Sequence, residues 1–168
     1  LSGWFLMDWL AAWYHGVASI DPKAHFEIIT RDDPMLVRKA VDPNNYLSER
    51  LRIEASLPEH MPERVRSHSL TAMFYAGGEI SELGRSPTRM AEVLGTGLPV
   101  VANEGVGDVA DIIQKHNVGV LVRDTSLKEI RKSYDKLMLL FSDDDLATRC
   151  RLAAEEVFSL KSGTKKYS

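Results

Sequence analysis

Apolar residues recur along the chain with two different periods, one typical of helices and the other typical of strands. Phe5, Trp9, Ala12 and Trp13 repeat at helical spacing and predict a helix over residues 4–18, with its aromatic stripe in the core. Runs rich in β-branched and aromatic residues predict strands over residues 25–30, 50–55, 71–75, 98–102 and 118–122. Because the two patterns alternate, we predict a doubly wound α/β domain, with a mostly parallel, Rossmann-like sheet and helices on both faces.

Turn and capping residues mark where the intervening helices begin. The Asp-Asp-Pro sequence at residues 32–34 predicts a helix that continues to Val41. Ser86-Pro87 predicts another start, because the serine oxygen can accept a backbone N–H and proline is tolerated in a first turn. The other helices are expected over residues 59–68, 108–116, 127–140 and 144–160.

Composition and charge narrow the class of protein. The 168 residues with 44% hydrophobic content suffice for one domain with a real core, and we expect a single domain over residues 1–168. Lys and Arg number 21 against 24 Asp and Glu, and no basic run occurs, so no nucleic-acid partner is expected. Cys150 is the single cysteine, and no apolar stretch reaches the roughly 20 residues that span a bilayer. We expect a cytoplasmic protein and, because the apolar start lacks an initiator methionine, part of a longer one.

One candidate binding segment lies at the predicted helix start near residue 86. In open α/β sheets, ligands bind beyond the carboxyl ends of the strands. Arg85, Ser86, Thr88 and Arg89 surround this start, where free backbone N–H groups and the helix dipole favour an anion such as phosphate. The alternative is that Ser86 only caps the helix and the arginines are solvated.

Two further features extend this candidate site. Glu92 follows about one helical turn later and can accept hydrogen bonds from a ribose diol, although a glutamate on a helix is more often a solvated surface residue. In the loop of residues 104–108, Gly105 and Gly107 flank Val106 and allow the backbone to approach a ligand closely. Asp108 in that loop can instead serve only as a helix cap.

The run SPTRMAEVLGTGLPVVANEGVGD at residues 86–108 resembles the donor-binding core of family 4 glycosyltransferases with the GT-B fold. In that family a helix bearing a glutamate precedes a small-Gly-x-Pro-Val-Val strand and a glycine loop. The resemblance is specific over residues 84–122, and the order of elements elsewhere is compatible with it. It implies the carboxyl-terminal, nucleotide-sugar-binding half of a two-domain enzyme, without the amino-terminal acceptor domain and without the first strand of this half.

The resemblance also implies roles for individual residues. It assigns the ribose hydroxyls to Glu92, the diphosphate to residues 86–89 and the surroundings of the donor sugar to residues 105–107. Ser56 and Leu57 fall where such proteins often contact the base. The catalytic residues are expected in the amino-terminal half.

The sequence departs from the family pattern at one position of the motif. Gly84 stands where many members have the first glutamate of a pair, and Glu82 is two residues too early to replace it. This departure indicates a variant subgroup in which Arg85 and Arg89 take more of the phosphate binding.

By this resemblance, the expected activity is transfer of a hexosyl or related sugar from a nucleotide diphosphate sugar to a glycan, lipid-linked or other acceptor, as in polysaccharide biosynthesis. Retention of configuration is implied, and neither a metal nor a cofactor is expected, because the helix dipole and the arginines can stabilise the leaving diphosphate. The isolated segment is expected to be inactive, and membrane association is expected only through the amino-terminal half. Two alternatives stay open: a non-catalytic nucleotide-binding or interaction module, and a sugar-nucleotide epimerase of the same architecture.

Other site classes lack their motifs. The chain has no Gly-x-Gly-x-x-Gly, no Gly-Lys-Ser/Thr triplet and no Gly-x-Ser-x-Gly. The five histidines lack metal-ligand spacing, so no zinc site is expected. The acidic run at residues 143–145 is interpreted as a helix cap, with a metal motif as its alternative.

Overall fold

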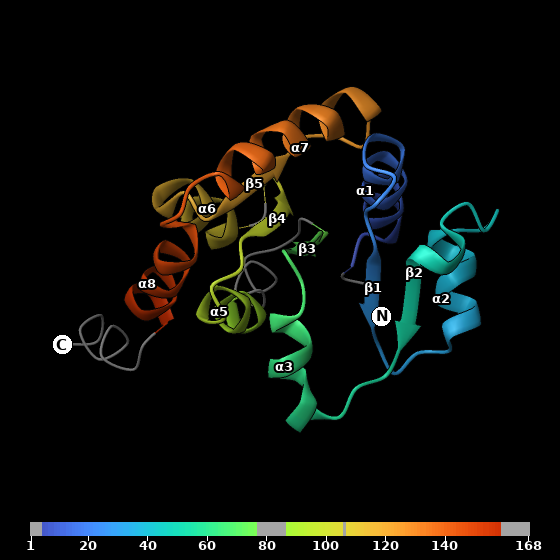
Figure 1. Ribbon diagram of the computed structural model, residues 1–168, viewed down its shortest axis with the longest axis horizontal. Coiled ribbons are helices and arrows are strands. Elements are labelled where there is room, and N and C mark those ends of the chain that lie inside the picture. Colours follow the sequence, from blue (N-terminus) through green and yellow to red (C-terminus); the bar gives the residue numbers. More distant parts are fainter. Residues whose placement is uncertain (1–4, 77–86, 106, 159–168) are drawn as a thin grey trace.

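The computed structural model describes residues 5–76, 87–105 and 107–158 of the chain. In chain order its elements are α1 (Met7–Ile20), β1 (Phe26–Ile29), α2 (Pro34–Val41), η1 (Ser48–Arg50), β2 (Leu51–Glu54), η2 (Pro58–His60), α3 (Met61–Arg66), β3 (Thr71–Met73), α5 (Pro87–Gly95), β4 (Val100–Asn103), α6 (Gly107–His116), β5 (Gly119–Val122), α7 (Leu127–Phe141) and α8 (Leu146–Phe158) (Figure 1). The elements η1 and η2 are short 3-10 helices.

The described strands form two parallel sheets. In the larger sheet β4 lies between β3 and β5, with Val100 opposite both Thr71 and Gly119. In the smaller sheet β1 pairs with β2, and Phe26 lies opposite Leu51. The predicted α/β class with parallel strands is therefore confirmed.

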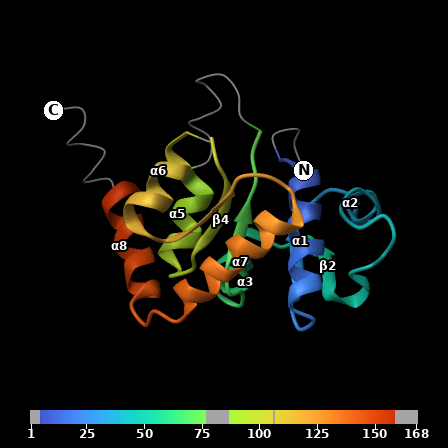
Figure 2. The ribbon, with the colours of Figure 1, turned by 90° about the horizontal axis from the view of Figure 1, so that it is seen from above.

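Helices cover both faces of the larger sheet. Val101, Val120 and Val122 belong to a core shared with α1 and α7, whereas Val100 and Ala102 belong to a core shared with α5, α6 and α8. Figure 2 shows α5 and α7 on opposite sides of β4. All four residues of β4 are buried, as expected for a strand covered on both faces.

Helix α1 spans the two sheets. The rings of Trp9 and Trp13 lie 5.9 Å and 6.3 Å from the ring of Phe74, which follows β3. The ring of Tyr14 lies 4.6 Å from that of Phe26 in β1. These contacts bury Trp13 and confirm the predicted core position of the aromatic stripe for this residue.

Helix α1 begins later than predicted. Phe5 lies before the helix and forms an isolated antiparallel bridge with Tyr75, while the Leu6 N–H donates to the Phe74 carbonyl oxygen at 3.1 Å. The prediction that Phe5 is helical is therefore wrong, because the main chain follows the edge of β3 before it turns into α1 at Met7.

Other boundaries shift by a few residues for local reasons. Asp33 caps α2 as predicted, since its side chain accepts from the Met35 N–H at 2.8 Å. The strand predicted over residues 98–102 begins only after Pro99, which has no N–H to donate to a neighbouring strand, and it extends to Asn103. The helix predicted over residues 59–68 is divided into η2 and α3.

Helices α1 and α7 approach each other closely at Gly16. A Cβ atom placed on this buried glycine would lie 2.7 Å from Cγ2 of Ile130. Because real side chains do not tolerate that distance, the two helices can pack this way only if residue 16 has no side chain.

Strand β1 has one edge that no described strand covers. The Thr30 N–H donates to the Glu54 carbonyl oxygen at 3.1 Å, so the backbone groups of Thr30 and Ile28 face β2. Because these groups alternate along a strand, those of Glu27 and Ile29 face the other side. On that open side, the Tyr14 hydroxyl donates to the Glu27 carbonyl oxygen at 3.2 Å.

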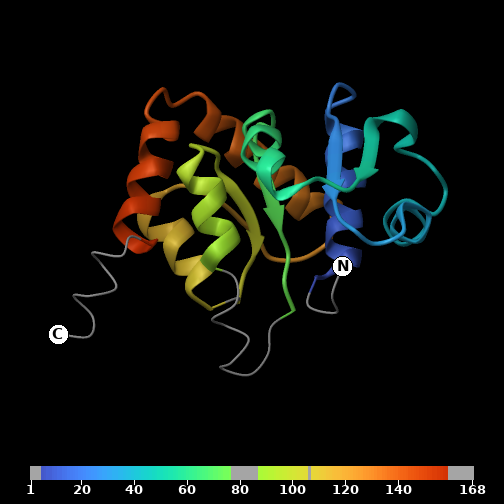
Figure 3. The same cartoon turned by 90° about the horizontal axis from the view of Figure 1, so that it is seen from below.

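Strand β3 also has an edge with which no described strand pairs, although Leu6 bonds to Phe74 near its end. The Thr71 N–H donates to the Pro99 carbonyl oxygen at 3.2 Å, so the backbone groups of Ala72 and Phe74 point away from β4. The antiparallel bridge at Tyr75 shows that the chain enters α1 opposite to β3, and β1 then returns in the direction of β3 (Figure 3). The two edges therefore run the same way, with α1 packed over both.

An ion cluster joins the smaller sheet to α3. The Glu27 side chain is 11% exposed and pairs with the Arg64 guanidinium, while its second oxygen lies 2.9 Å from Nε2 of His68. Arg64 also bonds to Glu54 at 2.5 Å, and its hydrogen bond to Glu27 raises the pKa of the guanidinium further. Since α3 leads into β3, this cluster connects the two sheets on the side opposite α1.

The Glu27→Gln variant tests the contribution of this cluster to stability. We expect a loss of about 2 kcal/mol in the free energy of unfolding, because Arg64 and His68 lose a buried carboxylate partner. Urea denaturation measures the difference. Glu59→Gln at an exposed position is the matched control and is expected to change stability by less than about 0.5 kcal/mol; equal effects of the two variants would contradict a structural role of the cluster.

Candidate functional site

Asn103 fixes the carboxyl ends of β3 and β4 relative to each other. Its side chain is 5% exposed, its Oδ1 accepts from the Tyr75 N–H at 3.0 Å, and its Nδ2 donates to the Tyr75 carbonyl oxygen at 2.8 Å. The side-chain amide thus continues the pairing of the two strands beyond Met73, the last residue of β3. The strand predicted over residues 98–102 ends one residue before Asn103, and the sequence did not predict its pairing with Tyr75.

Arg89 lies in the first turn of α5, which follows β3 in the fold. Its exposed side chain places Cζ 5.7 Å from the ring centroid of Phe5, and this ring lies 4.9 Å from that of Tyr75. Among the described residues, Arg89 forms no ion pair with a carboxylate. Arg123, by contrast, pairs with Glu104 at 3.1 Å. With respect to the described carboxylates, the charge and the N–H donors of Arg89 are available at the carboxyl end of β3.

The loop after β4 lies at the carboxyl end of that strand, next to the carboxyl end of β3. Gly105 is exposed, has a φ of +85°, and a Cβ atom placed on it would meet nothing within 4 Å. The left-handed backbone favours glycine here, and the open space leaves the main chain accessible. Helix α6 begins at Gly107, so two helix starts, those of α5 and α6, follow neighbouring parallel strands.

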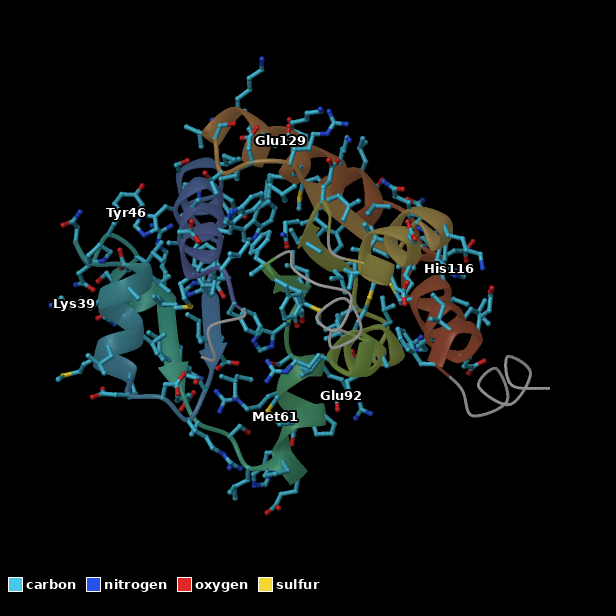
Figure 4. The ribbon with its side chains drawn as sticks, turned by 180° about the vertical axis from the view of Figure 1, so that it is seen from behind. Lys39, Tyr46, Met61, Glu92, His116 and Glu129 are labelled. Atoms are coloured by element: carbon cyan, nitrogen blue, oxygen red, sulfur yellow. The ribbon has the colours of Figure 1, made fainter. Side chains whose placement is uncertain are left out.

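Glu92 lies one turn further along α5. Its side chain is exposed, and Figure 4 shows it on the outer side of the helix. It forms no ion pair within the part of the chain that the structure describes. The carboxylate is thus free to accept hydrogen bonds from a ligand, and its position on the same helix as Arg89 agrees with the predicted spacing.

The remaining predicted site residues divide into two groups. Arg85, Ser86 and Val106, together with Gly84, lie outside the described residues. Ser56 and Leu57 follow β2 in the smaller sheet; the Ser56 hydroxyl donates to the Leu57 carbonyl oxygen at 3.2 Å, and the Leu57 side chain is 57% exposed. Thr88 and Arg89 lie in the first turn of α5, after β3, and Gly105 follows the neighbouring strand β4, whereas Ser56 and Leu57 follow a strand of the other sheet.

Two cavities are lined by other parts of the described chain. One of about 330 Å³ is lined by α1, α7 and Tyr46, and the other of about 520 Å³ lies along β5, α6 and α7. Glu104 lines the second cavity, but neither contains Arg89 or Glu92.

The described residues contain no candidate metal site. No group of three or more His, Cys, Asp and Glu side chains is placed to hold an ion there. Asp143 lies in the turn before α8, where its Oδ1 accepts from the Asp145 N–H at 3.0 Å, and its bond to Arg149 lowers the pKa of the carboxyl. Cys150 is buried, and burial raises the pKa of its thiol to about 11.

None of the described helices has both the length and the hydropathy required to cross a membrane.

Comparisons with known proteins give a structural likeness. No family model matches the sequence, and no curated protein matches it. Among solved structures, the chain is similar to one in "Crystal structure of GtfA/B complex", with a TM-score of 0.65 and 15% identity. The match covers 99% of this chain and 33% of that chain, so the chain spans about a third of the length of this structural relative. The likeness shows the fold alone, an α/β domain with parallel sheets and flanking helices.

The Asn103→Ala variant tests how the carboxyl ends of β3 and β4 are held. We expect a loss of about 2 kcal/mol in the free energy of unfolding, because the N–H and carbonyl of Tyr75 lose their partner. Asn44→Ala, at an exposed position, is the control. Urea denaturation measures both variants, and an unchanged stability of Asn103→Ala would show that the pairing is dispensable.

Proposed function

We propose that this chain is the donor-binding domain of a GT-B glycosyltransferase, which binds a nucleotide diphosphate sugar while an amino-terminal domain binds the acceptor. The observation that carries the proposal is Arg89, an exposed cation in the first turn of α5 that forms no ion pair with a described carboxylate. The likeness of the fold to part of a GT-B structure supports it.

The diphosphate is the part of the donor that this edge suits best. Arg89 offers a planar set of N–H donors. The first turns of α5 and α6, which follow neighbouring strands, offer further backbone N–H groups. Gly105 leaves room for the phosphates beside the main chain. These groups stabilise the negative charge that develops on the leaving diphosphate, so we propose a transfer that requires no metal. Retention of the configuration of the sugar is proposed on the family resemblance alone.

The ribose is proposed to bind one helical turn further on. Glu92 lies three residues after Arg89, and a carboxylate can accept hydrogen bonds from both hydroxyls of a diol. In this proposal Arg85, Ser86 and Thr88 complete the phosphate site, Val106 and Gly107 approach the sugar, and Ser56 and Leu57 stay predictions for the base.

Exposed apolar side chains support a partner domain on the same side. Met35 and Leu36 at the start of α2 are 78% and 67% exposed, and Leu57 after β2 is 57% exposed. All three follow the carboxyl ends of β1 and β2. We propose that the acceptor domain covers these residues and closes the site, and that any association with a membrane occurs through that domain.

Calorimetric titration with UDP, GDP and ADP tests the site in the presence of EDTA. We expect one of these nucleotides to bind, about tenfold weaker binding to Arg89→Ala through loss of charge-assisted hydrogen bonds, and about fivefold weaker binding to Glu92→Ala. Arg131→Ala and Glu155→Ala, at exposed positions on α7 and α8, are the matched controls.

The outcomes separate the residues from the function. If none of the nucleotides binds to the chain, the proposed function is contradicted. If one binds but Glu92→Ala has unchanged affinity, Glu92 is not part of the site. With the acceptor domain present, release of nucleoside diphosphate only when acceptor is added identifies a transferase, whereas release without acceptor identifies an epimerase.

We further propose that one parallel strand of this domain belongs between β1 and β3. No described strand pairs with the outer edges of β1 and β3, which run the same way and share the cover of α1. A strand that leads into α1 would run parallel to both edges and pair with the outward groups of Glu27, Ile29 and Ala72, while Phe74 keeps its bond to Leu6.

Hydrogen exchange tests this strand. The outward amides of Ile29 and Ala72 are expected to exchange rapidly in the 168-residue chain, and to become at least about a hundredfold slower when a Val/Ile-rich segment with a glycine turn is fused before Leu1. The inward amides of Ile28 and Met73 are the internal controls, and a fused segment with alternating prolines is the matched control. Equal exchange of the outward amides with either segment would contradict the proposal.

A further inference from the structure

The contacts around Phe5 suggest a role for this residue in the proposed donor site. The Phe5 ring lies under the Arg89 guanidinium, with 5.7 Å from Cζ to the ring centroid. We propose that Phe5 is a positioning residue, which holds Arg89 at the carboxyl end of β3 in the orientation that meets the diphosphate. This inference rests on the proposed function.

Phe5 is itself held in place by the end of the sheet. It forms a backbone bridge with Tyr75, its ring lies 4.9 Å from the Tyr75 ring at an angle of 50°, and the following N–H of Leu6 bonds to the Phe74 carbonyl at 3.1 Å. Tyr75 is fixed in turn by the buried side chain of Asn103. A continuous set of contacts thus connects the interior strand β4 to the exposed Arg89 side chain.

A guanidinium held over an aromatic ring keeps its capacity to bind an anion. Cζ of Arg89 lies over the Phe5 ring at a cation–π distance, and this attraction leaves the positive charge in place. Arg64 and Arg149 pair with carboxylates of the protein, and Arg89 has no such ion pair among the described residues. The ring therefore restricts the Arg89 side chain without neutralising its charge, which lowers the entropy lost when a phosphate binds.

The alternative role of Phe5 is structural, as an apolar residue that only covers the end of β3. The two roles predict different effects on ligands. A positioning role affects ligands that carry phosphates and depends on Arg89. A structural role affects nucleoside and nucleotide alike and does not depend on Arg89.

The experiment compares Phe5→Leu, which keeps apolar volume but removes the ring, with Phe5→Tyr, which keeps the ring. Each variant is titrated calorimetrically with the nucleoside diphosphate that binds the unaltered chain and with the corresponding nucleoside. We expect Phe5→Leu to bind the diphosphate about two- to fivefold more weakly. We expect Phe5→Tyr to bind it as the unaltered chain does, and nucleoside binding to change in neither variant.

A double-mutant cycle with Arg89→Ala completes the test, and Phe5→Leu should then cause no further loss. A second measurement needs no ligand: the aliphatic protons of Arg89 should lose their ring-current shift in Phe5→Leu. If Phe5→Leu leaves diphosphate affinity unchanged, weakens nucleoside binding equally, or acts additively with Arg89→Ala, the inference is overturned while the proposed function stands. If the unaltered chain binds none of the nucleoside diphosphates, the proposed function fails and the inference falls with it.

Discussion

The packing of Phe74 against Trp9 and Trp13 is the contact on which the rest of the arrangement depends. It holds α1 on the larger sheet, while Tyr14 on the same helix holds the smaller sheet. Because the chain before α1 runs along the end of β3, the same packing determines where Phe5 lies. The geometry around Arg89 is thus a result of core packing on the opposite face from α5.

Charge is distributed unevenly between the frame of the domain and the candidate site. Arg64, Arg123 and Arg149 each pair with a carboxylate. The pairs of Arg64 with Glu27 and of Arg123 with Glu104 connect elements that are distant in the sequence. Arg89 instead lies on an aromatic ring and remains exposed. An arginine that stabilises the fold is most effective when it pairs with a carboxylate of the protein. An arginine that binds a ligand must instead have its charge available to the ligand.

The sequence predicted the elements more accurately than their contacts. Helix starts such as Asp33 and strands such as residues 118–122 follow from local chemistry, and the structure agrees with them. The bridge of Phe5 to Tyr75 and the pairing of Asn103 could not be predicted, because both join segments far apart in the chain and depend on how β3 ends. Helical periodicity even placed Phe5 in the wrong element. The spacing from Arg89 to Glu92 was predictable from one helix, but the exposure of both residues depends on packing between helices.

The missing side chain at Gly16 has a consequence for how this fold can diversify. At this point α1 and α7 are in near-backbone contact, and Ile130 fills the space that any larger residue would require. A larger residue at position 16 would push α1 and α7 apart. Residue 16 is therefore expected to stay glycine in any domain that keeps α1 and α7 at this distance.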